Sequence, residues 1–293
     1  MAHDHRLGRI GIWSSLWSLA YGSGDPAQTG AAADAASEVE ALGYGTIWLG
    51  SSPQVEFTDP VLDATHRVTV ATGITPIWDQ DAATVAAQYA TLNERHPGRL
   101  LVGLGVSHAE LKPAYRHPYA AMQRYLSALD AASQPVPADR RILAALGPKM
   151  LTLSRNRALG AHPYLVTVDQ VAQERTILGP DAVLAPEFKV VLEPDLDRAR
   201  SLARGFLGRY LGMANYLASF RRDGFTDEDF RDGGSDRLLD AVFAMGGGDA
   251  VAAKIGALLD AGADHVAIQA VTEPPTAPQA VWRELAGFLP LSG

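Results

Sequence analysis

The stretch Pro97-Gly-Arg-Leu-Leu-Val-Gly-Leu-Gly-Val-Ser-His108 decides the fold class of this chain. Residues 99–103 form a continuous apolar run, which is typical of a strand buried on both faces of a parallel sheet. Glycines follow this strand directly, and such a turn exposes backbone N–H groups that can hold an anion. A tight turn from a strand into a helix needs the same glycines, so both interpretations of this loop stay open.

Short apolar runs alternate with helical patterns along the rest of the chain. We expect strands at residues 9–13, 45–49, 67–73, 99–103, 141–145, 164–167, 183–192 and 265–271. Eight strands interleaved with helices predict an α/β protein, a single (β/α)8 TIM barrel domain over residues 1–293. The alternative is a doubly wound open sheet, but no G-x-G-x-x-G motif opens the first unit.

The segment from residue 205 to residue 235 is the least regular part of the pattern. Six glycines are scattered through it among charged residues. We interpret it as an insertion near strand seven, in the role of a lid.

Composition excludes several classes of protein. The formal net charge of -8 disfavours a nucleic-acid partner, which requires a basic stripe, and the absence of cysteine excludes thiolate catalysis and cysteine-ligated metal sites. No two histidines or carboxylates recur at metal-ligand spacing, so we expect no metal site. No apolar run approaches the ~20 residues of a membrane span. We therefore expect a cytoplasmic protein that acts on a small molecule.

The residues that follow the expected strands are aromatic, small or hydroxylic. In a (β/α)8 barrel, the side chains that carry out chemistry lie at the carboxyl ends of the strands. A pocket with few ionisable groups suits a flat aromatic cofactor that brings its own chemistry. The candidate catalytic residues are Trp13, Ser51, Ser52 and His108.

His108 is the first candidate for a proton donor, because imidazole titrates near neutral pH and this residue follows the glycine loop. A role as an exposed loop histidine is the alternative. We interpret His162 as a hydrogen-bonded core histidine.

Four segments together resemble the luciferase-like monooxygenase superfamily, and more closely its actinobacterial branch of coenzyme F420-dependent oxidoreductases. They are Arg9-Ile-Gly-Ile-Trp13, Glu38-Val-Glu-Ala-Leu-Gly-Tyr-Gly-Thr-Ile-Trp48, Val70-Ala-Thr-Gly-Ile-Thr75 and the stretch from Pro97 to His108. The resemblance covers nearly the whole chain, because Leu146-Gly-Pro-Lys-Met150, residues 160–167 and residues 260–266 also look like family segments.

The resemblance implies a barrel with an insertion that binds F420, or alternatively FMN, at the carboxyl ends of its strands. It also implies a cis peptide bond between Gly73 and Ile74 against the ring of the cofactor. The backbone that binds the cofactor phosphate maps onto Gly105, Val106, Ser107, Leu146 and Gly147. Many F420 enzymes of the superfamily have an acidic residue and a histidine after strand two, where this chain has Ser51 and Ser52.

The function implied is that of an F420-dependent oxidoreductase, which transfers a hydride between the deazaflavin and an unknown small organic substrate. An FMN-dependent monooxygenase shares the same residues and is one alternative. A barrel that binds a ligand without catalysis is the other. The resemblance further implies a homodimer. It also suggests that arginines of the insertion face the polyanionic tail of F420; the insertion contains Arg209, Arg221, Arg222 and Arg231. The alternative is a solvated surface on which nearby acidic residues balance these arginines, namely Asp223, Asp227, Glu228, Asp229 and Asp232.

Overall fold

Parallel strands alternate with helices in the structure, a computed structural model that describes residues 7–273 and 277–291. The strands are β1 (Ile10–Ser14), β2 (Thr46–Leu49), β3 (Thr69–Thr72), β4 (Thr75–Pro76), β5 (Leu100–Gly105), β6 (Arg141–Leu143), β7 (Gly160–Ala161), β8 (Val183–Leu184), β9 (Glu187–Leu192), β10 (Phe243–Gly246) and β11 (Val266–Ala270). The helices are α1 (Leu16–Ser23), α2 (Pro26–Ala41), α3 (Asp59–Asp63), α4 (Ala82–Arg95), α5 (Pro118–Asp130), α6 (Pro148–Arg157), α7 (Val168–Leu178), α8 (Leu196–Leu207), α9 (Ala214–Arg222), α10 (Asp236–Val242), α11 (Gly248–Asp260) and α12 (Pro278–Ala286). Short 3-10 helices cover Val55–Thr58, Ala138–Arg140 and Asp227–Gly233.

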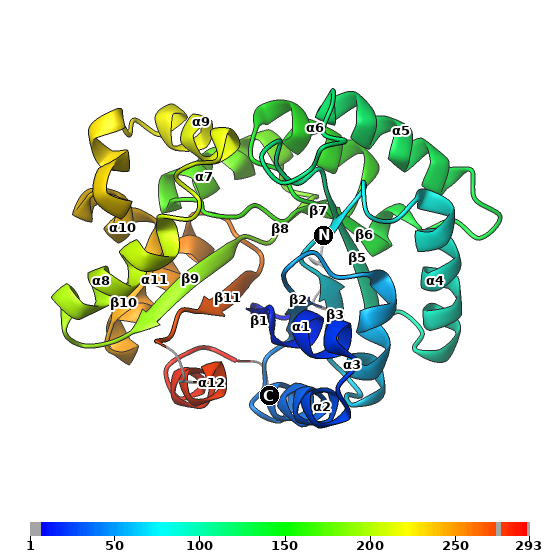
Figure 1. Ribbon diagram of the computed structural model, residues 1–293, viewed down its shortest axis with the longest axis horizontal. Coiled ribbons are helices and arrows are strands. Elements are labelled where there is room, and N and C mark those ends of the chain that lie inside the picture. Colours follow the sequence, from blue (N-terminus) through cyan, green and yellow to red (C-terminus); the bar gives the residue numbers. More distant parts are fainter. Residues whose placement is uncertain (1–6, 274–276, 292–293) are drawn as a thin grey trace.

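The sheet closes on one stretch of chain. Its strand order is β10-β9-β11-β1-β2-β3-β5-β6-β7-β8, with β4 beside β5. Strands β8 and β9 follow each other along residues 183–192, so the first part of this stretch pairs with β7 and the last part pairs with β11. The strands lie at the centre and the helices surround them (Figure 1). The expected (β/α)8 barrel is confirmed.

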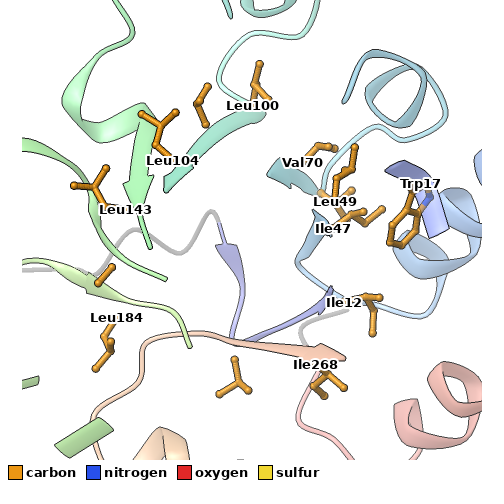
Figure 2. Packing of buried hydrophobic residues seen from close by; sticks show 14 of the residues in the cluster. Ile12, Trp17, Ile47, Leu49, Val70, Leu100, Leu104, Leu143, Leu184 and Ile268 are labelled. Atoms are coloured by element: carbon orange, nitrogen blue, oxygen red, sulfur yellow. The ribbon is translucent and has the colours of Figure 1, made fainter. Parts of the chain in front are cut away.

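Alternate side chains of the strands form two apolar layers. One layer faces the helices and includes Ile12, Ile47, Val70 and Leu104, which Figure 2 shows on successive strands. The other layer fills the barrel interior and combines large with small side chains, namely Leu7, Trp13, Trp48, Ala71, Leu101, Ile142, Val183, Ala185 and Ala267. Period-two alternation of side chains in a strand produces this division.

Two expectations about the strands are wrong. The sixth strand is β7, at residues 160–161, and not residues 164–167; the left-handed backbone of Leu165 (φ 55°) is incompatible with a strand there. Strand β10 was not expected at all, because its apolar residues follow α10 without a break and continue its apolar run. It pairs with the outer part of β9.

The expected insertion lies between β9 and β11 and is largely helical. It contains the end of α8, all of α9 and the 3-10 helix at Asp227–Gly233, and its Phe220 belongs to a second apolar cluster that also includes Val191 of β9 and Phe243 of β10. Its role as a lid stays a prediction. The expectation of one domain over residues 1–293 also stays a prediction, and it includes residues outside the described ranges. None of the described helices has the length and apolar character needed to cross a membrane.

The closing seam of the barrel requires a glycine at position 160. A Cβ atom on Gly160 would lie 1.8 Å from the carbonyl oxygen of Val183, so any side chain would force β7 and β8 apart. We expect Gly160→Ala to lower the free energy of unfolding by about 2–3 kcal/mol or to prevent folding. Gly205→Ala is the matched control, because this glycine lies within α8 with open space around it; here we expect a gain of up to about 1 kcal/mol. Urea denaturation of both variants checks the prediction, and equal stability of Gly160→Ala and the wild type would contradict it.

Candidate functional site

A cavity of about 430 Å³ opens where the carboxyl ends of the strands meet. Its lining residues follow β1, β2, β3, β5, β6 and β7, or come from the insertion. They are Trp13, Ser51, Ser52, Gly73, Ile74, Val106, Ser107, His108, Leu111, Ala144, Ala145, Leu146, Met150, His162, Tyr164, Arg209, Tyr210, Met213, Asn215 and Tyr216. No acidic side chain lines the cavity within the described part of the chain.

Most of the residues singled out in the sequence meet at this cavity. All four candidate catalytic residues line it, as do Gly73, Ile74, Val106, Ser107 and Leu146. Two others do not line it. Gly105 lies behind Ile74, whose Cδ1 atom would be 2.5 Å from a Cβ at this position, and Gly147 is the N-cap residue of α6. Their binding roles stay predictions.

Gly73 shapes the floor of the cavity. The Gly73–Ile74 peptide bond is cis, as the resemblance predicted. The indole Nε1–H of Trp13 donates a hydrogen bond to the Gly73 carbonyl over 3.0 Å. A Cβ atom at Gly73 would lie 2.7 Å from that indole nitrogen and 3.5 Å from His162 Nε2. Glycine is therefore required here for the Trp13 indole to lie against this peptide, whereas the spacing to His162 is an ordinary contact.

Three serines that line the cavity have left-handed backbone conformations. The φ angles are 61° at Ser51, 56° at Ser52 and 57° at Ser107. Residues other than glycine rarely adopt this conformation, and it concentrates at sites where function holds the backbone in place. The backbone conformations of the loops after β2 and β5 therefore indicate a functional site.

His108 lies half-buried in the cavity wall, and it is not the exposed loop residue of the alternative interpretation. Burial lowers its pKa, although a hydrogen bond with Asn215 and the charge of Glu110 oppose this shift. Its Nδ1 atom is buried without a hydrogen-bond partner in the described residues, and its ring centroid lies 4.9 Å from that of Tyr216. The imidazole is therefore neutral at neutral pH.

His162 was expected as a hydrogen-bonded core residue. It is buried and one ring nitrogen is hydrogen-bonded, but the residue also lines the cavity. The ring stacks on Trp48 at 4.0 Å with an interplanar angle of 5°, and Nδ1 lies 2.6 Å from the carbonyl oxygen of Ala185. The other ring nitrogen, Nε2, is buried without a hydrogen-bond partner in the described residues, and the residue lines the cavity. Trp48 in turn donates a hydrogen bond from its indole nitrogen to His265 Nε2, so these three rings fill the barrel interior.

Three tyrosines, Tyr164, Tyr210 and Tyr216, form a further part of the cavity wall. The hydroxyl of Tyr164 lies 2.8 Å from that of Tyr210 and donates to Gln269 Oε1 over 3.0 Å. Burial raises the pKa values of Tyr164, Tyr210 and Tyr216, so all three stay protonated. Behind this wall, the ammonium group of Lys189 lies 3.3 Å from the ring centroid of Tyr164.

Lys189 forms a fully buried ion pair with Glu187. Burial raises the pKa of Glu187 to about 7 and lowers that of Lys189 to about 8, and the attraction between the two charges opposes both shifts.

The arginines of the insertion differ in their partners. Arg221 pairs with Asp227, and Arg231 pairs with Glu228, so neither is free to face an anionic tail as the sequence suggested. Arg222 donates to the carbonyl of Leu146, beside the start of α6. Arg209 is exposed at the rim of the cavity and forms no ion pair with any described residue.

Potential metal ligands do meet elsewhere in the fold. Asp59, Asp63 and His96 lie together near α3 and the end of α4. Arg95 already bonds both carboxylates, and His96 precedes β5, at the end of the barrel opposite the cavity. This group takes no part in the site.

Several lining residues were missed in the sequence, among them Tyr164, Tyr210, Asn215 and Tyr216. All except Tyr164 come from the insertion, whose placement no strand pattern predicts. Tyr164 was assigned to a strand instead of to the loop after β7. The aromatic and polar composition of residues 209–216, directly after a helix, was the one available signal.

Comparisons with solved structures show the same fold at low sequence identity. An F420-dependent secondary alcohol dehydrogenase, in complex with an F420–acetone adduct, is 14% identical over 97% of this chain and 98% of that chain, with a TM-score of 0.71. The coenzyme F420-dependent tetrahydromethanopterin reductase from Methanopyrus kandleri is 15% identical over 96% and 98%, with a TM-score of 0.69.

A third structure is the FMN complex of a type II Baeyer–Villiger monooxygenase, the oxygenating constituent of 3,6-diketocamphane monooxygenase from Pseudomonas putida. It is 14% identical over 97% of this chain and 99% of that chain, with a TM-score of 0.65. A search of curated proteins finds no match. The profile of the family described as luciferase-like monooxygenase matches residues 11–265. The chain therefore belongs to the luciferase-like monooxygenase family and is an oxidoreductase of that family.

Proposed function

We propose that the protein is an F420-dependent oxidoreductase that transfers a hydride between the deazaflavin ring and a small organic substrate. The observation that carries this proposal is the charge of the cavity: its floor and walls are uncharged at neutral pH, and Arg209 at the rim is the one cation that lines it in the described residues. Such a site orients a ring and excludes water, and it leaves the redox chemistry to a cofactor.

The residues present fit a flavin-like ring. The absence of a side chain at Gly73 lets the Trp13 indole lie against the Gly73 peptide, and two buried nitrogens, His108 Nδ1 and His162 Nε2, have no partner in the described residues. The ring would lie against Gly73 and Ile74. The backbone of Val106, Ser107 and Leu146, with the amino end of α6, would hold its phosphate. When bound, a deazaflavin supplies the carbon that takes or gives the hydride.

FMN-dependent monooxygenation is the second candidate, and the FMN-bound neighbour described above supports it. Both cofactors share the ring and a phosphate, so the cavity floor fits both. Two features favour F420: two of the similar structures described above are F420-dependent enzymes, and Arg209 offers an unpaired charge to a polyanionic tail. The third candidate, ligand binding without catalysis, predicts no cofactor-dependent turnover. A homodimer and a cytoplasmic location stay part of the proposal.

His108 fits the role of proton acceptor better than that of proton donor. When an alcohol is oxidised to a carbonyl compound, the carbon gives up a hydride and the oxygen gives up a proton. A neutral imidazole in the cavity wall accepts that proton, since burial keeps it deprotonated. We therefore favour a small alcohol as the substrate.

The cofactor preference is tested by titrating the protein with F420 and with FMN and following fluorescence quenching. We expect F420 to bind at least about tenfold more tightly, which corresponds to about 1.4 kcal/mol. Equal or tighter binding of FMN would favour the monooxygenase.

Arg209→Ala should weaken F420 binding several-fold at low ionic strength, because the guanidinium attracts the anionic tail. The difference from the wild type should shrink in 0.5–1 M salt, where exposed charges interact over only about 3–4 Å. Arg231→Ala is the matched control and should bind F420 as the wild type does, since Glu228 already neutralises this arginine. Equal loss in both variants would argue against a specific role for Arg209.

The role of His108 is tested by His108→Asn with an alcohol that the wild type oxidises. We expect kcat to fall about 10²-fold while the dissociation constant of F420 stays within twofold. In the wild type, kcat/KM should decrease as the pH falls through the lowered pKa of His108, below about 6.5, because only the neutral imidazole accepts a proton. This acid limb should be absent from the variant, and its persistence would assign the titration to another group.

A further inference from the structure

The floor of the cavity contains a ring nitrogen that is buried but has no partner. His162 is 2% exposed and lines the cavity, and its Nε2 atom accepts or donates no hydrogen bond within residues 7–273 and 277–291. A buried polar atom without a partner costs about 1–3 kcal/mol. Because this cost is not offset within the described residues, we expect a ligand to supply the missing hydrogen-bond partner.

The contacts of the ring fix which kind of ligand atom it can meet. A carbonyl oxygen only accepts hydrogen bonds, so the 2.6 Å contact with the Ala185 carbonyl requires a hydrogen on Nδ1. A neutral imidazole carries one hydrogen, and Nε2 therefore presents a lone pair. The atom that meets it must be a hydrogen-bond donor.

The ring stays in this neutral form throughout the ordinary pH range. Burial lowers the pKa of His162 to about 3; the hydrogen bond with Ala185 opposes the shift, and the nearby His265 and Lys189 add to it. The stack on Trp48 prevents the ring from turning away. Nε2 lies beside Gly73 at the cavity lining, 3.5 Å from the position that a Cβ atom of this residue would occupy, so a ring placed against Gly73 lies next to this nitrogen.

We propose that His162 positions the cofactor by accepting a hydrogen bond from the imide N–H of its ring, the N–H between two carbonyl groups. The inference rests on the proposed function, since it assumes a flavin or deazaflavin in the cavity. In the oxidised state this imide is the one N–H that the rings of F420 and FMN share. His162 is therefore a positioning residue for either cofactor, and it does not discriminate between them.

The test compares each cofactor with its analogue methylated at the imide nitrogen, in the wild type and in His162→Phe, by fluorescence titration. The phenylalanine ring retains the stack on Trp48 and lacks the acceptor. We expect methylation to weaken binding to the wild type about tenfold or more, and to His162→Phe less than threefold. His162→Phe should bind the unmodified rings about tenfold more weakly. His108→Phe is the matched control at the other cavity histidine and should keep the full methylation penalty.

Each outcome has one meaning. If the wild type binds neither unmodified ring, the proposed function fails, and this inference fails with it. If the wild type binds the methylated and the unmodified rings equally well, the assignment to His162 alone is wrong. The same holds if methylation weakens binding to His162→Phe as much as to the wild type. Loss of F420 but not FMN binding in His162→Phe would indicate the 8-hydroxyl group of F420 as the donor and would overturn the imide assignment. If His162→Phe fails to fold, the comparison in the wild type alone tests the proposal: equal binding of the methylated and unmodified rings would overturn it.

Discussion

The hydrogen bond between His162 Nδ1 and the carbonyl of Ala185 connects the closure of the barrel to the chemistry of its cavity. Ala185 lies between β8 and β9, where the closing strand changes its partner from β7 to β11 and β10. Its N–H donates to the carbonyl of Ala161 over 2.9 Å, so this one residue both joins the strands and fixes the hydrogen of His162. The stack on Trp48, and through it the hydrogen bond to His265, depends on this arrangement. A displacement of the closing strand would therefore change which ligand atoms the floor can accept.

The wall of the cavity depends on different contacts from those of the floor. Helix α9 is held at its beginning by the bond from the Ala214 N–H to Glu110, in the loop after β5. At its end, Arg222 donates to the Leu146 carbonyl, and Thr167 donates to Asp223 over 2.5 Å. These three bonds join the insertion to loops that follow three different strands. Tyr216 belongs to an apolar cluster that also includes Val191 of β9 and Phe243 of β10, and Tyr210 packs against this cluster. The wall of the cavity is therefore joined to the barrel strands as well as to these loops.

The sequence was sufficient for the cavity residues at or directly after the strand ends but not for those of the insertion. Trp13, Ser51 and Ser107 could be placed there because parallel strands bring their carboxyl ends together, so position after a strand implies position at the site. Tyr210 and Asn215 could not, since their location depends on contacts such as that between Glu110 and Ala214, which no periodicity encodes.

Some of the errors have a local origin. Residues 164–167 have the composition of a strand, but the left-handed backbone at Leu165 ends the pairing after β7. Which nitrogen of His162 has a partner could not be decided from the sequence either.

The cavity as a whole carries little charge. Its histidines are neutral, its tyrosines are protonated, and Lys189 is neutralised by Glu187 behind the ring of Tyr164. A charged group at the floor would lose its hydration without gaining a counter-ion, whereas an uncharged ring loses little. The proposed cofactor would therefore lie with its uncharged ring inward and its charges toward Arg209 and the amino end of α6.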